Sequence, residues 1–267
     1  MLRRRKEHRL VYKMIVETDI TVEVLDARFP DLSRCRNIEK FVRSKNKPLL
    51  FCMNKCDLVP QEILEQWKKI LSSEAITVYV STREHLGTSM IRKELFRAAK
   101  KKKGSPIRSC LIGLPNTGKS SLINVLAGRH SARVSPRPGY TRSLQYVRIS
   151  PQLLMVDTPG ISPVDSYSVE EKMFLGAISA DKEPDIDIIA GYFIQRIYEN
   201  SPESIKEYLD FEPDISDPEE VLGQLALKRG KLLSGGIPDI QTVSKILIKD
   251  FQQGKIPYCE SPTVRKL

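Results

Sequence analysis

Long hydrophobic runs are missing from this sequence of 267 residues, and no apolar stretch approaches the roughly 18 residues that a membrane-spanning helix needs. We therefore expect no membrane insertion. Residues 1–6 are rich in arginine and lack the apolar core of a secretory signal, so a cytosolic location is expected. No internal repeat is apparent.

Cysteine and histidine are also scarce. The five cysteines are odd in number, scattered and without CxxC spacing, and the sequence has only three histidines. A zinc site needs clustered ligands of these types, so neither a zinc site nor a disulfide framework is expected. Buried free thiols are the better interpretation of the cysteines.

Charge is distributed unevenly along the chain. The formal net charge is +10, yet residues 181–220 carry thirteen acidic against three basic residues, so the rest of the chain carries a net +20. This excess, with basic runs at 3–6 and 100–103, favours a polyanionic partner such as RNA. Any single run could instead merely solvate a helix end.

The length of the chain and its pattern of hydrophobic residues predict one larger domain and a smaller second unit. Apolar runs typical of strands alternate with segments of helical spacing, which indicates an α/β fold with a mostly parallel six-stranded sheet and helices on both faces. The expected strands are 20–25, 48–53, 76–80, 107–112, 144–149 and 153–156. The last two are joined by too few residues for a crossover and should form an antiparallel hairpin.

After residue 160 the strand pattern ends, and the sequence indicates helices separated by proline and glycine. The expected helices are 170–178, 186–198, 202–209, 218–228 and 240–251. We place a boundary near residue 180, which gives an α/β domain at 1–180 and a small all-α domain at 181–267.

A phosphate-binding motif, GxxxxGK[ST], lies at residues 113–120 between an expected strand and an expected helix. Glycines let the backbone curl so that its N–H groups surround a phosphate, and the helix N-terminus adds positive potential. Lys119 would bridge the β- and γ-phosphates, and Ser120 would ligate Mg²⁺. The residues expected around the phosphates are Asn116, Thr117, Gly118, Lys119, Ser120 and Ser121.

A second phosphate-side motif, Asp-Thr-Pro-Gly, starts at Asp157 directly after an expected strand. In phosphate-loop proteins such an aspartate holds Mg²⁺, and the N–H of the following glycine, here Gly160, senses the γ-phosphate. The tetrapeptide alone is also a good turn, so its weight comes from the neighbouring motif.

A candidate base-recognition loop has the sequence Asn54-Lys55-Cys56-Asp57 and follows another expected strand. The pattern Asn-Lys-x-Asp resembles the guanine loop of GTPases, in which the aspartate accepts bonds from N1–H and the exocyclic amine. Adenine has an acceptor in place of N1–H, so Asp57 would reject ATP. The alternative is that Asp57 only caps the next helix.

Two weaker candidates complete the set. Ser81 and Thr82 end the strand at 76–80 and resemble the fifth GTPase motif, whose backbone amides contact the guanine oxygen. Thr141, between the phosphate loop and the hairpin, is the candidate switch threonine that closes on Mg²⁺ and the γ-phosphate.

The order of these motifs differs from that of ordinary GTPases, because the guanine loop and the base-contact loop precede the phosphate loop. Loops at the carboxyl ends of parallel strands can converge whatever their sequence order. In this order, the sequence resembles the circularly permuted GTPases of the YlqF/RbgA and YawG type. The resemblance covers nearly the whole chain and includes a DARxP-like segment at 26–30 and the stretch at 228–236.

The resemblance implies a GTPase with GTP/GDP and Mg²⁺ as ligands, acting as a monomer in late assembly of the large ribosomal subunit, with the helical domain on ribosomal RNA. Asn116 matches an asparagine that coordinates K⁺ in potassium-stimulated relatives. Ile161 occupies the place of the glutamine that orients water in Ras-like enzymes, and a hydrophobic side chain cannot do this. His8 is either a substitute for that group or part of a basic arm facing RNA.

Catalysis would then rest on Lys119, Thr141 and Gly160, and hydrolysis should be slow unless the ribosome completes the site. Two alternatives stay open. One is an RNA-binding assembly factor that uses GTP as a latch with negligible turnover. The other is a GTP switch in signalling or translation.

Overall fold

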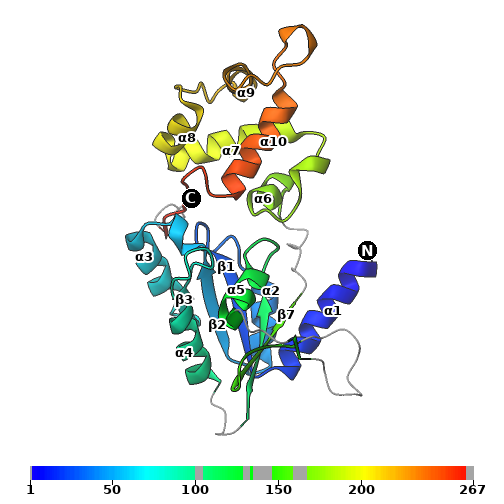
Figure 1. Cartoon of the computed structure of the whole chain (residues 1–267), viewed down its shortest axis with the longest axis vertical. Coiled ribbons are helices and arrows are strands. Elements are labelled where there is room, and N and C mark those ends of the chain that lie inside the picture. Colours follow the sequence, from blue (N-terminus) through cyan, green and yellow to red (C-terminus); the bar gives the residue numbers. More distant parts are fainter. Residues whose placement is uncertain (1, 100–104, 129–132, 135–145, 159–166, 263–267) are drawn as a thin grey trace. The chain divides into compact units, whose positions relative to one another are not determined.

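The computed structural model describes residues 2–99, 105–128, 133–134, 146–158 and 167–262 (Figure 1). Contacts divide the chain into residues 1–162 with 261–267, here called the sheet unit, and residues 163–260, called the helical unit. The sequence pattern placed the boundary near residue 180. The short helix α6 (Val169–Phe174) lies between these two positions, and Phe174 packs on Phe193 and Phe251 of the helical unit with ring centroids 5.0 and 4.5 Å apart.

The sheet unit is built on a sheet with strand order β3-β2-β1-β4-β7-β6-β5. The pairs β1·β2, β2·β3, β1·β4 and β4·β7 are parallel, while β5·β6 and β6·β7 are antiparallel. The mostly parallel sheet and the antiparallel pairing of β6 with β7 are thus confirmed. The sheet has seven strands in the described residues instead of the expected six, because β5 is only two residues long, too short for a strand pattern, and pairs with β6 beyond the predicted hairpin. The strands are β1 (Ile20–Asp26), β2 (Leu49–Asn54), β3 (Ile76–Tyr79), β4 (Ile107–Ile112), β5 (Arg133–Val134), β6 (Tyr146–Ser150) and β7 (Leu153–Asp157).

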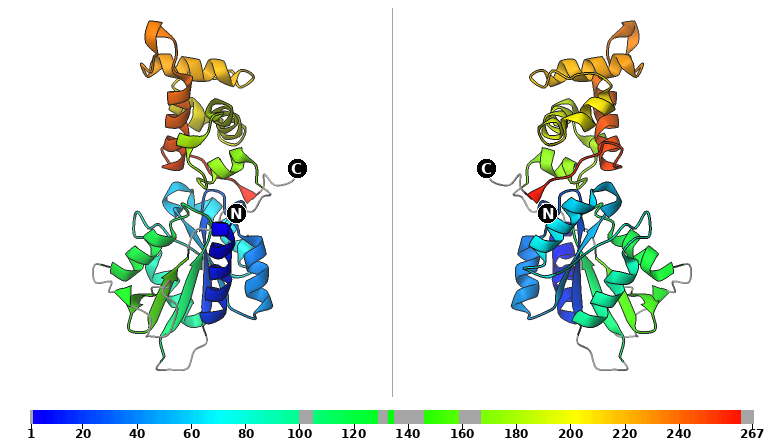
Figure 2. Two further views of the ribbon diagram at one scale, coloured as in Figure 1. Left: turned by 90° about the vertical axis from the view of Figure 1, so that its right-hand side faces the viewer. Right: turned by 90° about the vertical axis from the view of Figure 1, so that its left-hand side faces the viewer.

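Helices cover both faces of the sheet. Figure 2 shows α1 and α2 on one side and α4 and α5 on the other. Alternate residues of β1 (Ile20, Val22 and Val24) pack in one buried cluster with Ile91 of α4 and Leu122 of α5. The helices of this unit are α1 (Leu2–Glu17), α2 (Arg36–Ser44), α3 (Gln61–Leu71), α4 (Thr88–Ala98) and α5 (Lys119–Ala127), with a 3₁₀ turn η1 (Cys56–Leu58).

The helical unit packs around aromatic rings. Phe174, Phe193, Phe251 and Tyr258 are buried against one another, and the guanidinium of Arg196 lies 4.7 Å from the centroid of the Phe174 ring. Besides α6, its elements are η3 (Ala180–Lys182), α7 (Ile186–Asn200), α8 (Pro202–Leu209), α9 (Pro218–Lys228), η4 (Ser234–Gly236) and α10 (Ile240–Gln252). None of the helices in the described ranges is long and apolar enough to span a bilayer.

Two helices of the sheet unit were not predicted. α1 is rich in charged residues, and among residues 9–17, the part of the helix whose side chains the structure describes, Val11, Met14 and Ile15 are buried. α2 is short and buries Ile38 and Val42. Both patterns are too brief for helical periodicity to stand out in the sequence. The five cysteines are free, with all but Cys259 buried.

Candidate functional site

The predicted motif residues meet at one edge of the sheet. Parallel strands β1, β2, β3, β4 and β7 end at the same edge, so the loops that follow them are neighbours in space. The phosphate loop (residues 113–120) follows β4, the guanine loop (54–57) begins at the last residue of β2, and Asp157 ends β7. The base-contact loop (81–82) comes just after β3.

Close backbone approach explains two glycines of the phosphate loop. Gly113 has φ 143°, and a Cβ there would lie 2.5 Å from the carbonyl oxygen of Val24. Gly118 has φ 95°, and its Cβ would lie 2.1 Å from Nδ2 of Asn54. Both positions therefore exclude a side chain, and the loop curls tightly against β1 and the guanine loop.

Lys119 begins α5, and its side chain turns back over the phosphate loop. Its Nζ donates to the carbonyl oxygens of Gly113 at 3.0 Å and Leu114 at 2.7 Å. Burial lowers the pKa of this ammonium, while the charge of Asp157 opposes that shift. A buried cation whose hydrogen bonds within the described ranges go to neutral carbonyls is well placed to pair with a phosphate.

A hydroxyl and a carboxylate lie together beside the same loop. The Ser120 hydroxyl donates to Oδ2 of Asp157 at 2.5 Å. Oδ1 of Asp157 is buried and has no hydrogen-bond partner within the part of the chain that the structure describes. A hydroxyl beside a carboxylate with a spare oxygen suits Mg²⁺, which prefers oxygen ligands. The described residues contain no group of three or more His, Cys, Asp or Glu side chains arranged to hold a metal.

The amide of Asn54 joins three loops. Its Nδ2 donates to the carbonyl oxygen of Thr117 at 2.8 Å, and its Oδ1 accepts from the backbone N–H of Thr82 at 3.2 Å. Asn54 is itself almost fully buried. One side chain therefore ties the guanine loop to both the phosphate loop and the base-contact loop.

Asp57 lies in the turn η1 and is exposed, so its carboxylate is free to meet a base from solvent. Backbone bonds fix this turn, because Cys56 N–H donates to Val80 O at 3.1 Å and Val80 N–H donates to Met53 O at 2.8 Å. Ser81 is buried, and its hydroxyl accepts from Glu84 N–H at 2.9 Å.

The structure describes two of the remaining candidate residues and leaves three outside the described ranges. Asn116 is exposed with φ 60°, and Ser121 is exposed in the first turn of α5. Thr141, Gly160 and Ile161 lie outside the described residues.

Sequence reasoning assigned no role to Asp26, the last residue of β1. Its carboxylate accepts from Lys55 Nζ at 2.7 Å and from the guanidinium of Arg28 at 2.9 and 3.0 Å. The sequence did contain one indication of a role for Asp26. This aspartate ends a strand, and the loops that carry the motifs leave the sheet at the same edge.

Several basic residues of the helical unit form ion pairs with nearby carboxylates. Lys228 pairs with Asp210, Lys249 with Asp181 at 2.8 Å, and Lys255 with Asp250 at 2.6 Å. Arg229 also pairs with Asp250 at 3.5 Å and stacks 4.5 Å from the ring centroid of Tyr208. The pairs Lys228–Asp210 and Lys249–Asp181 are exposed, and such pairs contribute little to stability, so an RNA phosphate could replace the carboxylate.

Comparison with known families matches residues 108–213 to the 50S ribosome-binding GTPases. The match begins at the strand before the phosphate loop and leaves out the guanine loop at 54–57. That is the result expected when a guanine loop has moved ahead of the phosphate loop.

Relatives of similar sequence cover most of this chain. An uncharacterized GTP-binding protein of Methanocaldococcus jannaschii is 34% identical over 94% of the chain and 66% of its own length. Nuclear/nucleolar GTPase 2 of Oryza sativa is 34% identical, and nucleolar GTP-binding protein 2 of Saccharomyces cerevisiae is 33% identical, each over 94% of the chain. The chain spans 47% and 52% of these two relatives' lengths.

Solved structures share the fold over nearly the full chain. YlqF of T. maritima bound to GNP has a TM-score of 0.68 at 23% identity, covering 96% of this chain and 98% of its own. The GDP-bound structure of the same protein gives a TM-score of 0.67 at 23% identity, covering 95% of this chain and 99% of its own.

Proposed function

Because the chain belongs to the circularly permuted GTPases, we propose that it binds and hydrolyses GTP and uses that cycle to control its association with the assembling large ribosomal subunit. The observation that carries nucleotide binding is the pair of hydrogen bonds from Asn54 to Thr117 and Thr82. These bonds bring base-reading and phosphate-binding loops, far apart in the chain, around one site.

Guanine is selected by Asp57 in this proposal. Its exposed carboxylate accepts from N1–H and the exocyclic amine of guanine, while adenine would leave one acceptor facing another. The backbone of Ser81 and Thr82 lies beside this turn and would contact the guanine oxygen.

On the phosphate side, Lys119 exchanges its carbonyl partners for phosphate oxygens and offsets their negative charge. The N–H groups at the start of α5, through Ser121, would donate to the β-phosphate. Ser120 and Asp157 would hold Mg²⁺, with Thr141 as the switch ligand; the metal neutralises charge on the phosphates. Asn116 is the candidate K⁺ ligand, and Gly160 would sense the γ-phosphate.

The ribosomal part of the proposal rests on relatives. The matching family is described as ribosome-binding, and the rice and yeast relatives are named nucleolar. We infer that this chain, as a monomer, contacts large-subunit rRNA through basic residues of the helical unit and of α1. Because the rice and yeast relatives are named nucleolar, we expect a cytosolic location for this chain only in a cell that has no nucleolus.

Two measurements test the proposal. Calorimetric titration should show binding of GTP and GDP but not of ATP, and equal binding of ATP would refute guanine recognition. GTP turnover should be slow for the protein alone and rise when large-subunit particles are added.

The latch alternative is favoured by Ile161, which cannot orient water as glutamine does. It predicts GTP-dependent particle binding with no turnover above background in either condition. A signalling or translation switch instead predicts that depletion leaves subunit profiles normal.

A further inference from the structure

The guanine loop contains a residue in a strained backbone conformation. Lys55 has φ 65°, in the left-handed region that a lysine rarely adopts. It lies between Asn54, which joins the loops, and Asp57, which faces solvent. A residue in this conformation persists only when its surroundings hold it there. The contacts of Lys55 therefore decide how Asp57 is presented to the base.

Those contacts come from the end of β1. Lys55 Nζ lies 2.7 Å from Oδ2 of Asp26, and Ala27 N–H donates to Asn54 O at 2.8 Å. Asp26 and Asn54 are also partners in the parallel register of β1 and β2. One ion pair and one backbone bond thus clamp the start of the guanine loop to β1.

Asp26 is itself rigidly fixed. Oδ1 accepts from Arg28 Nε at 3.0 Å and from Arg28 N–H at 3.1 Å, and Oδ2 accepts from Arg28 Nη2 at 2.9 Å. The two side chains are only 3% and 2% exposed. Burial would raise the pKa of the Asp26 carboxyl, but Arg28 and Lys55 outweigh it and hold that pKa well below its usual range.

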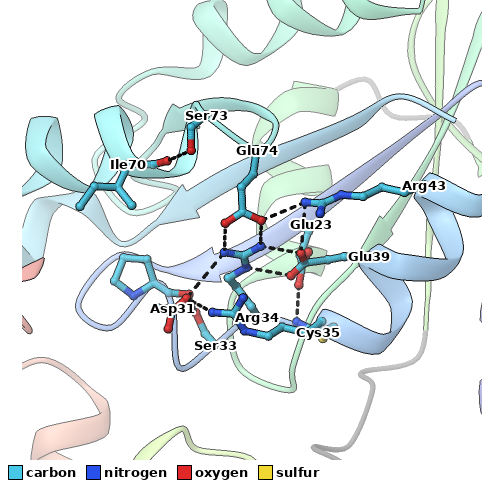
Figure 3. Close-up of polar contacts among 12 residues, drawn as sticks. Glu23, Asp31, Ser33, Arg34, Cys35, Glu39, Arg43, Ile70, Ser73 and Glu74 are labelled. Atoms are coloured by element: carbon cyan, nitrogen blue, oxygen red, sulfur yellow. Dashed lines mark hydrogen bonds and ion pairs between the residues drawn. The ribbon is translucent and has the colours of Figure 1, made fainter. Parts of the chain in front are cut away.

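The connection from β1 to α2 is anchored at its far end as well (Figure 3). Arg34 donates to both oxygens of Glu39 at 2.8 and 2.6 Å and to both oxygens of Glu74 at 2.8 and 2.6 Å. Between the two anchors, Ser33 Oγ accepts from Asp26 N–H at 3.0 Å. The connection therefore holds Asp26 from both sides.

We propose that Asp26 is a positioning residue for guanine recognition, holding the Lys55 ammonium against the end of β1 so that Asp57 meets the base in a fixed orientation. The inference rests on the proposed binding of GTP. A residue needed only for folding would change stability without changing which base is preferred.

A double-mutant cycle tests this role. Affinities for GDP and for IDP, which lacks the exocyclic amine, are measured calorimetrically for wild type, Asp26→Asn, Lys55→Met and the double variant. We expect each single variant to lose about tenfold in GDP affinity and less in IDP affinity, so the GDP:IDP preference falls. The double variant should be little weaker than either single variant, because both remove the same contact.

The matched control is Asp19→Asn, which makes the same change just before β1, at the opposite end of the strand. Asp19 accepts from Arg108 N–H at 2.8 Å and lies far from the guanine loop, so both affinities should stay at wild-type values. If Asp26→Asn does not fold, Lys55→Met decides, since it alters the solvent-accessible end of the contact. An unchanged GDP:IDP ratio in a folded variant, or additive losses in the cycle, would overturn the inference. Failure of wild type to bind GDP would instead overturn the proposed function.

Discussion

Asn54 Nδ2 donates to the carbonyl oxygen of Thr117 across 2.8 Å, although the two residues belong to loops that follow different strands. The bond is buried, and the Nδ2 atom fills the space that a side chain at Gly118 would need. The base-reading side and the phosphate side of the site are therefore not independent, because a shift of one loop breaks a buried hydrogen bond with the other.

Replacing Asn54 with Ala should weaken nucleotide binding without touching the nucleotide directly. The change removes the Asn54 partner of the buried Thr117 carbonyl, at a cost of about 1–3 kcal/mol, and of the part-buried Thr82 N–H, at a smaller cost. We expect GDP affinity to fall by roughly 10- to 100-fold, measured by calorimetric titration. Asn124→Ala, on the exposed side of α5, is the control. Equal affinities for the two variants would contradict the joining role of Asn54.

Changing Asp57 to Asn should transfer specificity from guanine to xanthine. Asparagine offers one acceptor and one donor, which match N1–H and the C2 carbonyl of xanthine, whereas guanine has two donors there. Competition between GTP and XTP should shift toward XTP by about 100-fold or more. Asp57 is exposed in a backbone-bonded turn, so the fold should be unaffected. Retained preference for GTP would show that another group reads the base.

Removal of Mg²⁺ should distinguish a variant at the proposed metal ligand Ser120 from a variant at its neighbour Ser121. In the proposed site the adjacent Ser120 hydroxyl and Asp157 carboxylate would be oxygen ligands of Mg²⁺, so Ser120→Ala should abolish the gain in GTP affinity that Mg²⁺ gives wild type. Affinities are compared with Mg²⁺ and with EDTA. Ser121→Ala, one residue along the same helix, should keep the full gain. A metal-independent wild type would refute the ligand assignment.

Charge reversal on α10 tests the RNA surface. Lys249 is about half exposed and pairs with Asp181, a weak contact that an RNA phosphate could replace. The Lys245→Glu, Lys249→Glu double variant should bind large-subunit particles more weakly and with a shallower salt dependence. The control, Lys40→Glu with Lys69→Glu, makes an equal change in net charge on exposed lysines of the sheet unit. Particle binding like that of the control would exclude α10 from the interface.

Much of this site could be predicted from the sequence because its chemistry is carried by short contiguous motifs. Gly113, Gly118 and Lys119 are recognisable because only glycine and a long cation suit a curled loop around phosphate. The strands that carry the motifs are buried runs whose ends differ by a residue or two from expectation, as for β2, which extends to Asn54.

Long-range pairing could not be predicted in the same way. Nothing in the sequence shows that Asp26 pairs with Lys55 or that Arg34 bridges Glu39 and Glu74, because each contact depends on which strands become neighbours. The sequence likewise does not show that Lys228 pairs with Asp210 or that Lys255 pairs with Asp250. Local periodicity likewise did not reveal α2, whose helical pattern is short.

We expect Glu23 to make the stability of the protein depend on pH. The side chain is fully buried in β1, where Oε1 accepts from Cys35 N–H at 2.5 Å and Oε2 has no partner among the described residues (Figure 3). Burial, reinforced by the charge of Glu39, raises the pKa of Glu23 to about 8. In the unfolded chain a glutamate titrates near 4.3.

Between about pH 4.3 and about pH 8, Glu23 is protonated in the folded protein and ionised in the unfolded chain. The folded state therefore binds one more proton, so the free energy of unfolding should fall as pH rises from about 4.3 to about 8. Glu23→Gln resembles the protonated acid and keeps an acceptor for Cys35 N–H, so it removes this loss. Urea unfolding at pH 5.5 and 7.5 should show the variant gaining on wild type by roughly 1 kcal/mol per pH unit. The exposed control Glu84→Gln should show no such change, and a pH-independent difference for Glu23→Gln would mean that Glu23 is ionised in the folded state.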